Sequence, residues 1–402
     1  MLVVDTTDLA FSRDPHPFLR DARERGPLAF DAFGTPILLR YSDVDAALKD
    51  PRFINDYDVL ITRHGITSGP LYDWWKLAML NTNPPVHTRL RGLASRAFTP
   101  RAANGTRERM RALTVEHLQA FEGRDSIDLI DEVTESLPLT IVCDMMGVPR
   151  DDHHSFHQWV ADIGLMFSDS IPDENRAGAE HAMSALGDYV VAMIEQKRRV
   201  PDESLMSTLI AAEEGGDRLS YDELVALVVN LMLGALDTSR SALSIGLWLL
   251  WTHHVRTVTP ALIEEILRYE PPSGELRRTA GEDFELCGVP VAAGTSVALS
   301  VMSANRDASA YGDPDRFEAE RFTKTPGPSG PQSGITPPHL TFGRGSHFCL
   351  GNAIARVEMQ EVLDVIITRY PDLEVLTDSP RWVPFLRVRR FEKLPVRLGD
   401  PS

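Results

Sequence analysis

Cysteine and positive charge are both scarce in this chain. Its 402 residues include only Cys143, Cys287 and Cys349, which are too scattered for a disulfide framework or a zinc site. Against 58 acidic residues stand 41 lysines and arginines, so the net charge is -17. This excess of negative charge argues against a general nucleic-acid-binding protein, because nothing offsets repulsion by the phosphates.

The N-terminus also lacks the positive charge of a signal peptide, since MLVVDTTDL carries only acids. A long apolar run extends from about 221 to 251, but Asp237 and Arg240 sit near its centre, where a bilayer penalises charge. We therefore expect a cytoplasmic protein with no membrane association. The composition, 43% hydrophobic and 25% charged, is that of a soluble globular protein with a large core.

The segment Phe342–Gly351, FGRGSHFCLG, holds the most informative cysteine. A thiolate is a soft ligand that can hold a haem iron, and Gly343 and Gly345 allow a tight loop to approach a flat molecule. The pattern that follows predicts a long helix, which places Cys349 near a helix N-terminus that favours an anionic sulfur. Taken alone, however, a single cysteine is more often a small buried apolar residue.

The apolar run from about 221 to 251 predicts a buried central helix. Ser220 and Glu223 form a capping box at its start. Asp237 and Thr238 lie at its middle, and a buried acid next to an alcohol is costly unless it is paired, which indicates function. The structural alternative is an aspartate whose hydrogen bonds are all internal.

Other segments predict local structure with less detail. We expect helices through 104–215, a long loop region with a helical turn at 51–80, strands at 277–301, and strands again around 383–396. His87 with Arg91, and Glu265 with Arg268, are spaced to share a helix face. Either pair alone would be interpreted as a surface pair.

Together the motifs resemble those of the cytochrome P-450 superfamily. The Cys349 segment, with Ala355, Arg356 and Glu358 after it, is similar to the superfamily's haem-binding loop. The sequence GALDT is similar to its oxygen-activation motif, with Ala235 where glycine is commoner. The H-x-x-x-R that begins at His87 and the E-x-x-R of the later helix also match, in the expected order and across nearly the whole chain.

This resemblance implies a mainly α fold with small β-sheets, in a single domain over 1–402 with no fused reductase. Haem b would lie between the long central helix and the Cys349 loop. The implied reaction is that of a monooxygenase, which hydroxylates or epoxidises a mainly apolar small molecule with dioxygen and releases the second oxygen atom as water. The setting would be bacterial secondary metabolism or the catabolism of an apolar carbon source.

The resemblance also implies roles for individual residues. Cys349 would ligate the iron, Thr238 would hydrogen-bond the distal oxygen, and Asp237 would relay protons. The implied cofactor-binding residues are His87, Arg91, Arg278, Phe342, Gly343, His347 and Gly351. A structural clamp beneath the haem would consist of Glu265, Arg268 and Arg321. The implied pocket wall is Trp74, Trp75, Met79, Leu165, Phe167, Gly234, Leu236 and Leu276, with Arg63, His64 and Arg277 as nearby cations for a polar handle on the substrate.

A separate ferredoxin or flavodoxin would supply electrons by docking near Cys349, on a basic patch formed by Arg89, Arg96, Arg344 and Arg356. The link after Trp251 is shorter than in family members by about two helical turns. Two alternatives remain open: a haem-thiolate enzyme that uses peroxide or rearranges its substrate, and a non-catalytic haem sensor or binding protein. The retained acid–alcohol pair argues against both.

Overall fold

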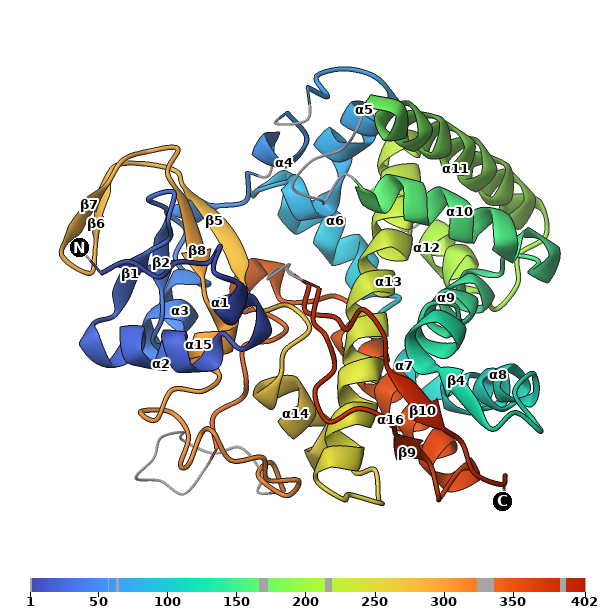
Figure 1. Ribbon diagram of the computed structural model, residues 1–402. Helices are drawn as coiled ribbons and strands as arrows, with labels where there is room; N and C mark the ends of the chain where they lie inside the picture. The colour runs from blue at the N-terminus through green and yellow to red at the C-terminus, as the bar shows by residue number, and fades with distance from the viewer. Residues whose placement is uncertain are drawn as a thin grey trace. The chain divides into compact units, whose positions relative to one another are not determined.

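The computed structural model describes residues 2–56, 58–62, 65–165, 173–213, 219–323, 336–383 and 388–401. Three predicted pocket residues, Arg63, His64 and Phe167, lie outside this part, and so does the side chain of Leu236. The described chain is mainly helical with small β-sheets, as the sequence predicts (Figure 1).

The chain divides into two compact units. The first comprises Met1–Ile54, Arg107–Glu135 and Thr238–Ser402, and the second comprises Asn55–Thr106 and Ser136–Asp237. The boundary between them falls inside helix α13 (Tyr221–Thr252). The expectation of a single domain therefore stays a prediction.

The first unit is built on a five-stranded sheet with the order β1-β2-β8-β5-β3. Its strands are β1 (Leu28–Phe30), β2 (Pro36–Leu38), β3 (Phe53–Ile54), β5 (Leu276–Ala280) and β8 (Ser296–Leu299). Strands β2 and β8 run parallel, whereas the other pairs are antiparallel. Because side chains alternate along a strand, Leu38 packs into the core on one face and Ile37 into the core on the other.

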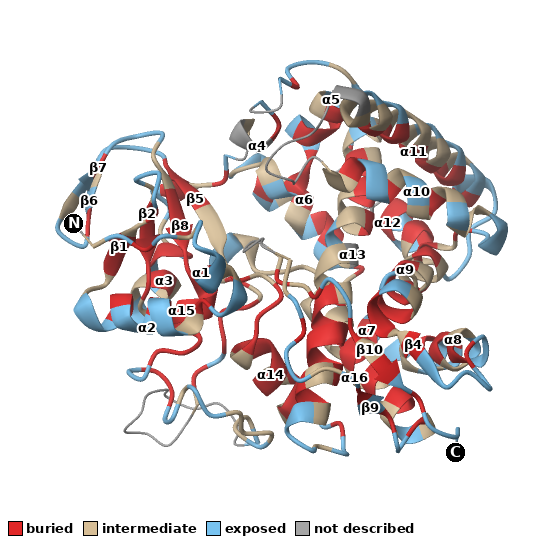
Figure 2. Cartoon of the chain, in the orientation of Figure 1, coloured by how far each residue is buried: buried red, intermediate tan, exposed pale blue. Residues whose placement is uncertain are grey.

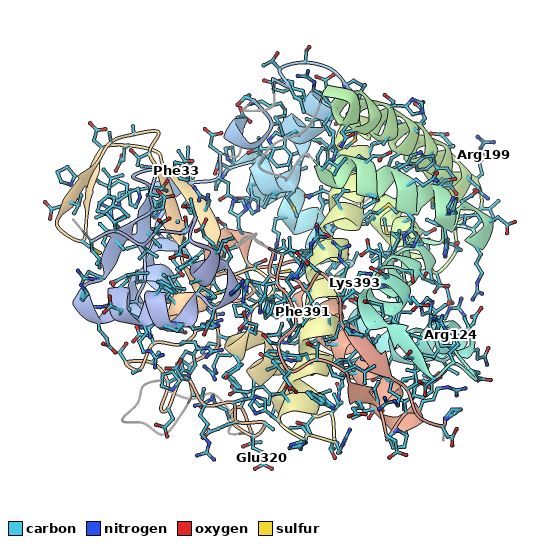
Figure 3. All side chains as sticks on the ribbon, in the orientation of Figure 1. Phe33, Arg124, Arg199, Glu320, Phe391 and Lys393 are labelled. Atoms are coloured by element: carbon cyan, nitrogen blue, oxygen red, sulfur yellow. The ribbon has the colours of Figure 1, made fainter. Side chains whose placement is uncertain are left out.

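Helices and two smaller sheets complete this unit. The helices are α1 (Leu9–Arg13), α2 (His16–Arg25), α3 (Tyr41–Ala47), α8 (Arg107–Gln119), α14 (Pro260–Tyr269), α15 (Val301–Ala304) and α16 (Asn352–Arg369), with the π-helix η2 (Ile130–Thr134) and the 3-10 turn η5 (Gly345–His347). The smaller sheets are β4-β10-β9 (Ser126–Asp128, Pro395–Arg397, Glu374–Val375) and the hairpin β6-β7 (Phe284–Leu286, Val289–Val291). Phe391 lies inside the unit against Trp248 of α13 and Trp382 (Figure 3).

The second unit is helical in the part that the structure describes. Its elements are α4 (Asp58–Thr62), α5 (Pro70–Leu77), η1 (Met79–Asn81), α6 (Val86–Ser95), α7 (Pro100–Gly105), α9 (Leu137–Met146), η3 (Arg150–Asp152), α10 (His153–Gly164), α11 (Asp173–Arg199), α12 (Leu205–Glu213) and the first half of α13. Helix α11 packs against α5, α10 and α12.

Helix α13 is continuous from Tyr221 to Thr252, and its second half is buried almost throughout (Figure 2). The predicted capping box is present, because Ser220 N–H donates to Glu223 Oε2 at 2.8 Å and Glu223 N–H donates to Ser220 Oγ at 3.1 Å. By length and composition, α13 is the one helix among the described residues that is long and apolar enough to cross a membrane, a test that buried core helices also pass.

Two sequence expectations need correction. The 51–80 region contains more helix than predicted, since α5 is only two turns long and too short to show a period. In the tail, the described strand structure is confined to β9, β10 and the bridge between Trp382 and Phe391, while 384–387 lie outside the described residues. Residues 253–259 join α13 to α14 without a helix, and the expectation that this link is shorter than in family members stays a prediction.

Candidate active site

The Cys349 loop is closed by its own backbone. Cys349 N–H donates to the carbonyl oxygen of Phe342 at 2.8 Å, and Gly343 takes a left-handed conformation with a φ of +68°. The side chain of Asn352, the first residue of α16, donates to the Cys349 carbonyl oxygen at 2.7 Å. The half-buried thiol therefore sits just before the start of a long helix, as the sequence predicts.

Gly345 and Gly351 of this loop differ in whether the surrounding protein requires a glycine at that position. Gly345 has a φ of +68°, and a Cβ there would lie 2.5 Å from the carbonyl oxygen of Leu48, the residue that ends α3. The loop is thus pressed against a backbone that sequence analysis did not connect with it. A Cβ at Gly351 would meet no described protein atom within 4 Å, and its φ is -79°. Protein packing therefore does not require glycine at 351.

An aromatic and charged layer ties the loop to α14. The guanidinium of Arg356 lies 4.4 Å from the centre of the Phe342 ring and also donates to Glu264 on α14. Burial acts to raise the pKa of Glu264, but hydrogen bonds from His339 and Arg356 outweigh it and lower that pKa to about 2. The start of α16 is therefore held on α14 by an ionised carboxylate.

The three predicted clamp residues lie together. Arg268 donates to both carboxylate oxygens of Glu265, at 2.7 and 2.8 Å. Arg321 Nε approaches the same two oxygens at 3.2 and 3.1 Å. The Glu265 and Arg268 side chains are fully buried, so each charge depends on its partners.

The residues predicted to bind the cofactor fall in both units. His87 and Arg91 lie one turn apart on α6 in the second unit, where His87 is buried and Arg91 half-buried. In the first unit, Arg278 is buried on β5 and donates to the Arg277 carbonyl oxygen at 2.7 Å, while half-buried His347 ends η5. Within the first unit, Leu276 on β5 lies close to Gly343 of the Cys349 loop.

Asp237 and Thr238 lie side by side on α13, both half-buried, and the helix is unbroken from Gly234 through Thr238. The next residue makes a contact that the sequence analysis missed. Ser239 Oγ donates to Glu358 Oε2 of α16 at 2.7 Å. Burial raises the pKa of Glu358 to about 7, against the opposing effect of the Ser239 bond. Glu358 stands out in the sequence only as part of the motif after Cys349, and nothing there connects it with Ser239.

The predicted pocket residues occupy different environments. Trp74 and Trp75 of α5 are buried in the second unit, and Trp74 Nε1 donates to the Ala226 carbonyl oxygen of α13 at 3.3 Å. Met79 is also buried, and Leu165 is half-buried at the end of α10. Gly234 is exposed on α13.

The predicted basic patch carries its own counter-charges. Arg89 pairs with Glu223, Arg344 Nε lies 3.4 Å from Asp45 Oδ1, and Arg356 pairs with Glu264. Arg96, the fourth, is exposed at the end of α6. Three of the four arginines therefore have a carboxylate beside them within their own unit.

Comparison with known proteins identifies the family. The sequence profile of cytochrome P450 matches residues 41–255 and 255–384. The chain belongs to the cytochrome P450 family. Cytochrome P450 107B1 of Saccharopolyspora erythraea is 35% identical, over 98% of this chain and 97% of that protein. The mycinamicin IV hydroxylase/epoxidase of Micromonospora griseorubida is 32% identical, over 93% and 91%. Among solved structures, CalO2 superposes with a TM-score of 0.88 at 26% identity, over 99% of each chain.

These similarities confirm the P450 fold and the enzyme class. The chain is a P450 monooxygenase, and the family uses a haem-thiolate cofactor, small-molecule substrates, dioxygen and redox partners. The residues present fit such a cofactor. The Cys349 loop offers a soft sulfur donor at the surface of a closed turn, and the buried guanidinium of Arg278 in the same unit is the kind of group that binds carboxylates.

Proposed function

We propose that this P450 hydroxylates or epoxidises a mainly apolar small molecule in bacterial secondary metabolism. It works in the cytoplasm as one domain with haem b, and it takes two electrons from a separate ferredoxin or flavodoxin. The observation that carries the proposal is the Cys349 loop, which the hydrogen bond from Cys349 N–H to the Phe342 carbonyl oxygen closes just before α16. Named relatives with hydroxylase and epoxidase activities support the reaction type.

In this proposal Cys349 is the iron ligand. His87, Arg91, Arg278 and His347 hold the haem propionates, and Phe342, Gly343 and Gly351 face the macrocycle. When bound, the haem supplies dioxygen binding and activation, and electron donation by the thiolate favours O–O cleavage. The clamp of Glu265, Arg268 and Arg321 keeps α14 and the segment before the loop in place, which is a structural role.

Asp237 and Thr238 deliver protons in this proposal. Their adjacent positions on α13, both half-buried, suit a carboxylate that exchanges protons with solvent and a hydroxyl that presents one to the reacting oxygen. A proton delivered to the wrong oxygen releases peroxide in place of product. The pair therefore controls what fraction of the electrons consumed is used to form product.

An apolar substrate is supported by the side chains of the proposed wall. Trp74, Trp75 and Met79 are large and apolar, as is Leu276 of β5. The cation proposed for a polar handle, Arg277, has its Nε 2.8 Å from Glu275 Oε1. A carboxylate on the substrate would have to compete with Glu275, which favours substrates without a strong negative charge.

The test begins with the ferrous-carbonyl adduct. We expect the red-shifted Soret band of a thiolate ligand in the wild type and its loss in Cys349→Ala; a histidine-type spectrum in the wild type would refute the proposal. Turnover with a ferredoxin system then separates the alternatives, because a peroxide-using enzyme, a rearranging enzyme or a sensor would not consume reductant in proportion to product. A screen for compounds that shift the haem from low to high spin identifies the substrate class. Hits confined to small, strongly charged molecules would rule out the apolar pocket.

A further inference from the structure

Helix α5 lacks a cap from its own sequence. It begins at Pro70 after Gly69, which has a φ of +97° and no side chain to bond the first turn. Pro70 has no N–H, and Asp73 N–H makes the first bond within the helix, to the Gly69 carbonyl oxygen at 2.9 Å. The first amide that needs an outside acceptor is therefore that of Leu71.

Glu180 of α11 supplies this acceptor. Leu71 N–H donates to Glu180 Oε2 at 3.0 Å, across 109 positions of sequence. A carboxylate at a helix N-terminus satisfies a backbone donor and interacts favourably with the helix dipole. A Cβ at Gly69 would lie 3.2 Å from the same oxygen, so the glycine leaves room for the carboxylate to reach the helix.

A second side chain of α11 lies against the same segment. Arg176 precedes Glu180 by one turn, and its Nη1 would lie 3.0 Å from a Cβ at Gly65, whose φ is +72°. Two successive turns of α11 thus contact residues 65–71, and α5 packs on α11 (Figure 1). The middle of α5 is held separately, because Trp74 is buried and donates to the Ala226 carbonyl oxygen of α13.

We propose that Glu180 is a positioning residue that couples α5 to α11, and that release of its cap admits and releases substrate. The second half of this proposal rests on the proposed function, in which α5 borders the substrate pocket. Trp74 keeps the helix in place when the cap is lost, so only the first turn loosens. A lost N-cap increases the opening of that turn roughly five- to tenfold, and such low-stability segments are where gating motions occur.

The first measurement is hydrogen exchange on the haem-loaded protein. In Glu180→Ala we expect the amides of residues 71–73, in the first turn of α5, to exchange about five- to tenfold faster. Glu180→Gln should lie between this variant and the wild type, because its amide oxygen still accepts the Leu71 bond without the charge. Glu195→Ala is the matched control on α11, since the contact described for Glu195 is with Arg198 on its own helix, at 3.3 Å. Unchanged exchange at α5 in both Glu180 variants overturns the proposal.

The second measurement is stopped-flow binding of 4-phenylimidazole, followed by haem absorbance. We expect association and dissociation to accelerate by similar factors in Glu180→Ala, which leaves Kd nearly unchanged, whereas Glu195→Ala should match the wild type. Faster exchange at α5 with unchanged binding rates would refute the gating role and the placement of α5 at the pocket. A wild-type protein without a thiolate spectrum would instead refute the proposed function, while the exchange result would still decide the coupling.

Discussion

Ser239 of α13 donates its hydroxyl to Glu358 of α16 at 2.7 Å, and both residues are buried. The second carboxylate oxygen, Oε1, has no hydrogen-bond partner among the described residues. One bond from a neutral hydroxyl does not compensate a buried negative charge. Burial therefore raises the pKa of Glu358 to about 7, and the acid carries a proton in the folded protein below that pH.

We expect this carboxyl to make stability depend on pH. Between its ordinary pKa of 4.5 and about 7, the folded protein binds more protons at this site than the unfolded chain does. The contribution of this site to stability is therefore fully present below pH 4.5 and is lost as the pH rises towards 7, by roughly 1.4 kcal/mol per unit of pKa shift. Glu358→Gln removes the titrating group, so the free energy of unfolding, measured with urea at a series of pH values, should change less between pH 4.5 and about 7. The control is Glu374→Gln, at an exposed residue, which should leave this pH dependence as it is in the wild type. If the free energy of unfolding depends on pH equally in the wild type and in Glu358→Gln, the prediction is wrong.

Removing one member of the buried clamp should cost far more than removing a surface pair. Glu265→Ala leaves the buried Arg268 without its carboxylate, and such a loss costs about 3–5 kcal/mol. Arg381→Ala is the control, because Arg381 is 82% exposed and its pair with Glu392 is long, at 3.4 Å, so the expected change is under about 1 kcal/mol. Chemical denaturation measures both. Equal effects of the two substitutions would show that the clamp does not stabilise the fold.

Thr238→Ala should uncouple electron use from product formation. Without the hydroxyl, more of the reduced oxygen leaves as peroxide, so the ratio of product to reductant consumed falls while reductant consumption continues. A group that transfers protons typically contributes about 10²–10⁴-fold to a rate, so we expect the ratio of product to reductant consumed to fall by up to about 10²-fold. Thr252→Ala on the same helix is the control, since Thr252 is exposed and bonds only the Trp248 carbonyl oxygen among the contacts described. Full coupling in Thr238→Ala would exclude the proposed role.

The two glycines at either side of the Cys349 turn should respond differently to alanine. Gly345→Ala places a Cβ 2.5 Å from the Leu48 carbonyl oxygen and strains a φ of +68°, and we expect a loss of about 1–3 kcal/mol in stability. Gly351→Ala meets no described protein atom and has an ordinary φ of -79°. Thermal unfolding of the haem-loaded proteins compares the two. Destabilisation of Gly351→Ala as strong as that of Gly345→Ala would contradict this prediction.

Local spacing in the sequence determined much of what the structure shows. Glu265 and Arg268 are three residues apart on one helix face, so their pairing follows from helical geometry. The capping box of Ser220 and Glu223 is equally local. The position of Cys349 just before α16 follows from the apolar period of that helix.

The tertiary structure alone decided the contacts between distant segments. Ser239 meets Glu358 119 positions away, Gly345 lies against Leu48, and Glu180 caps a helix 109 positions before it. No period or spacing encodes such pairs, because they arise only when helices and loops pack and each buried polar group must find a partner. The sequence shows which residues can bond, and packing determines which of them meet.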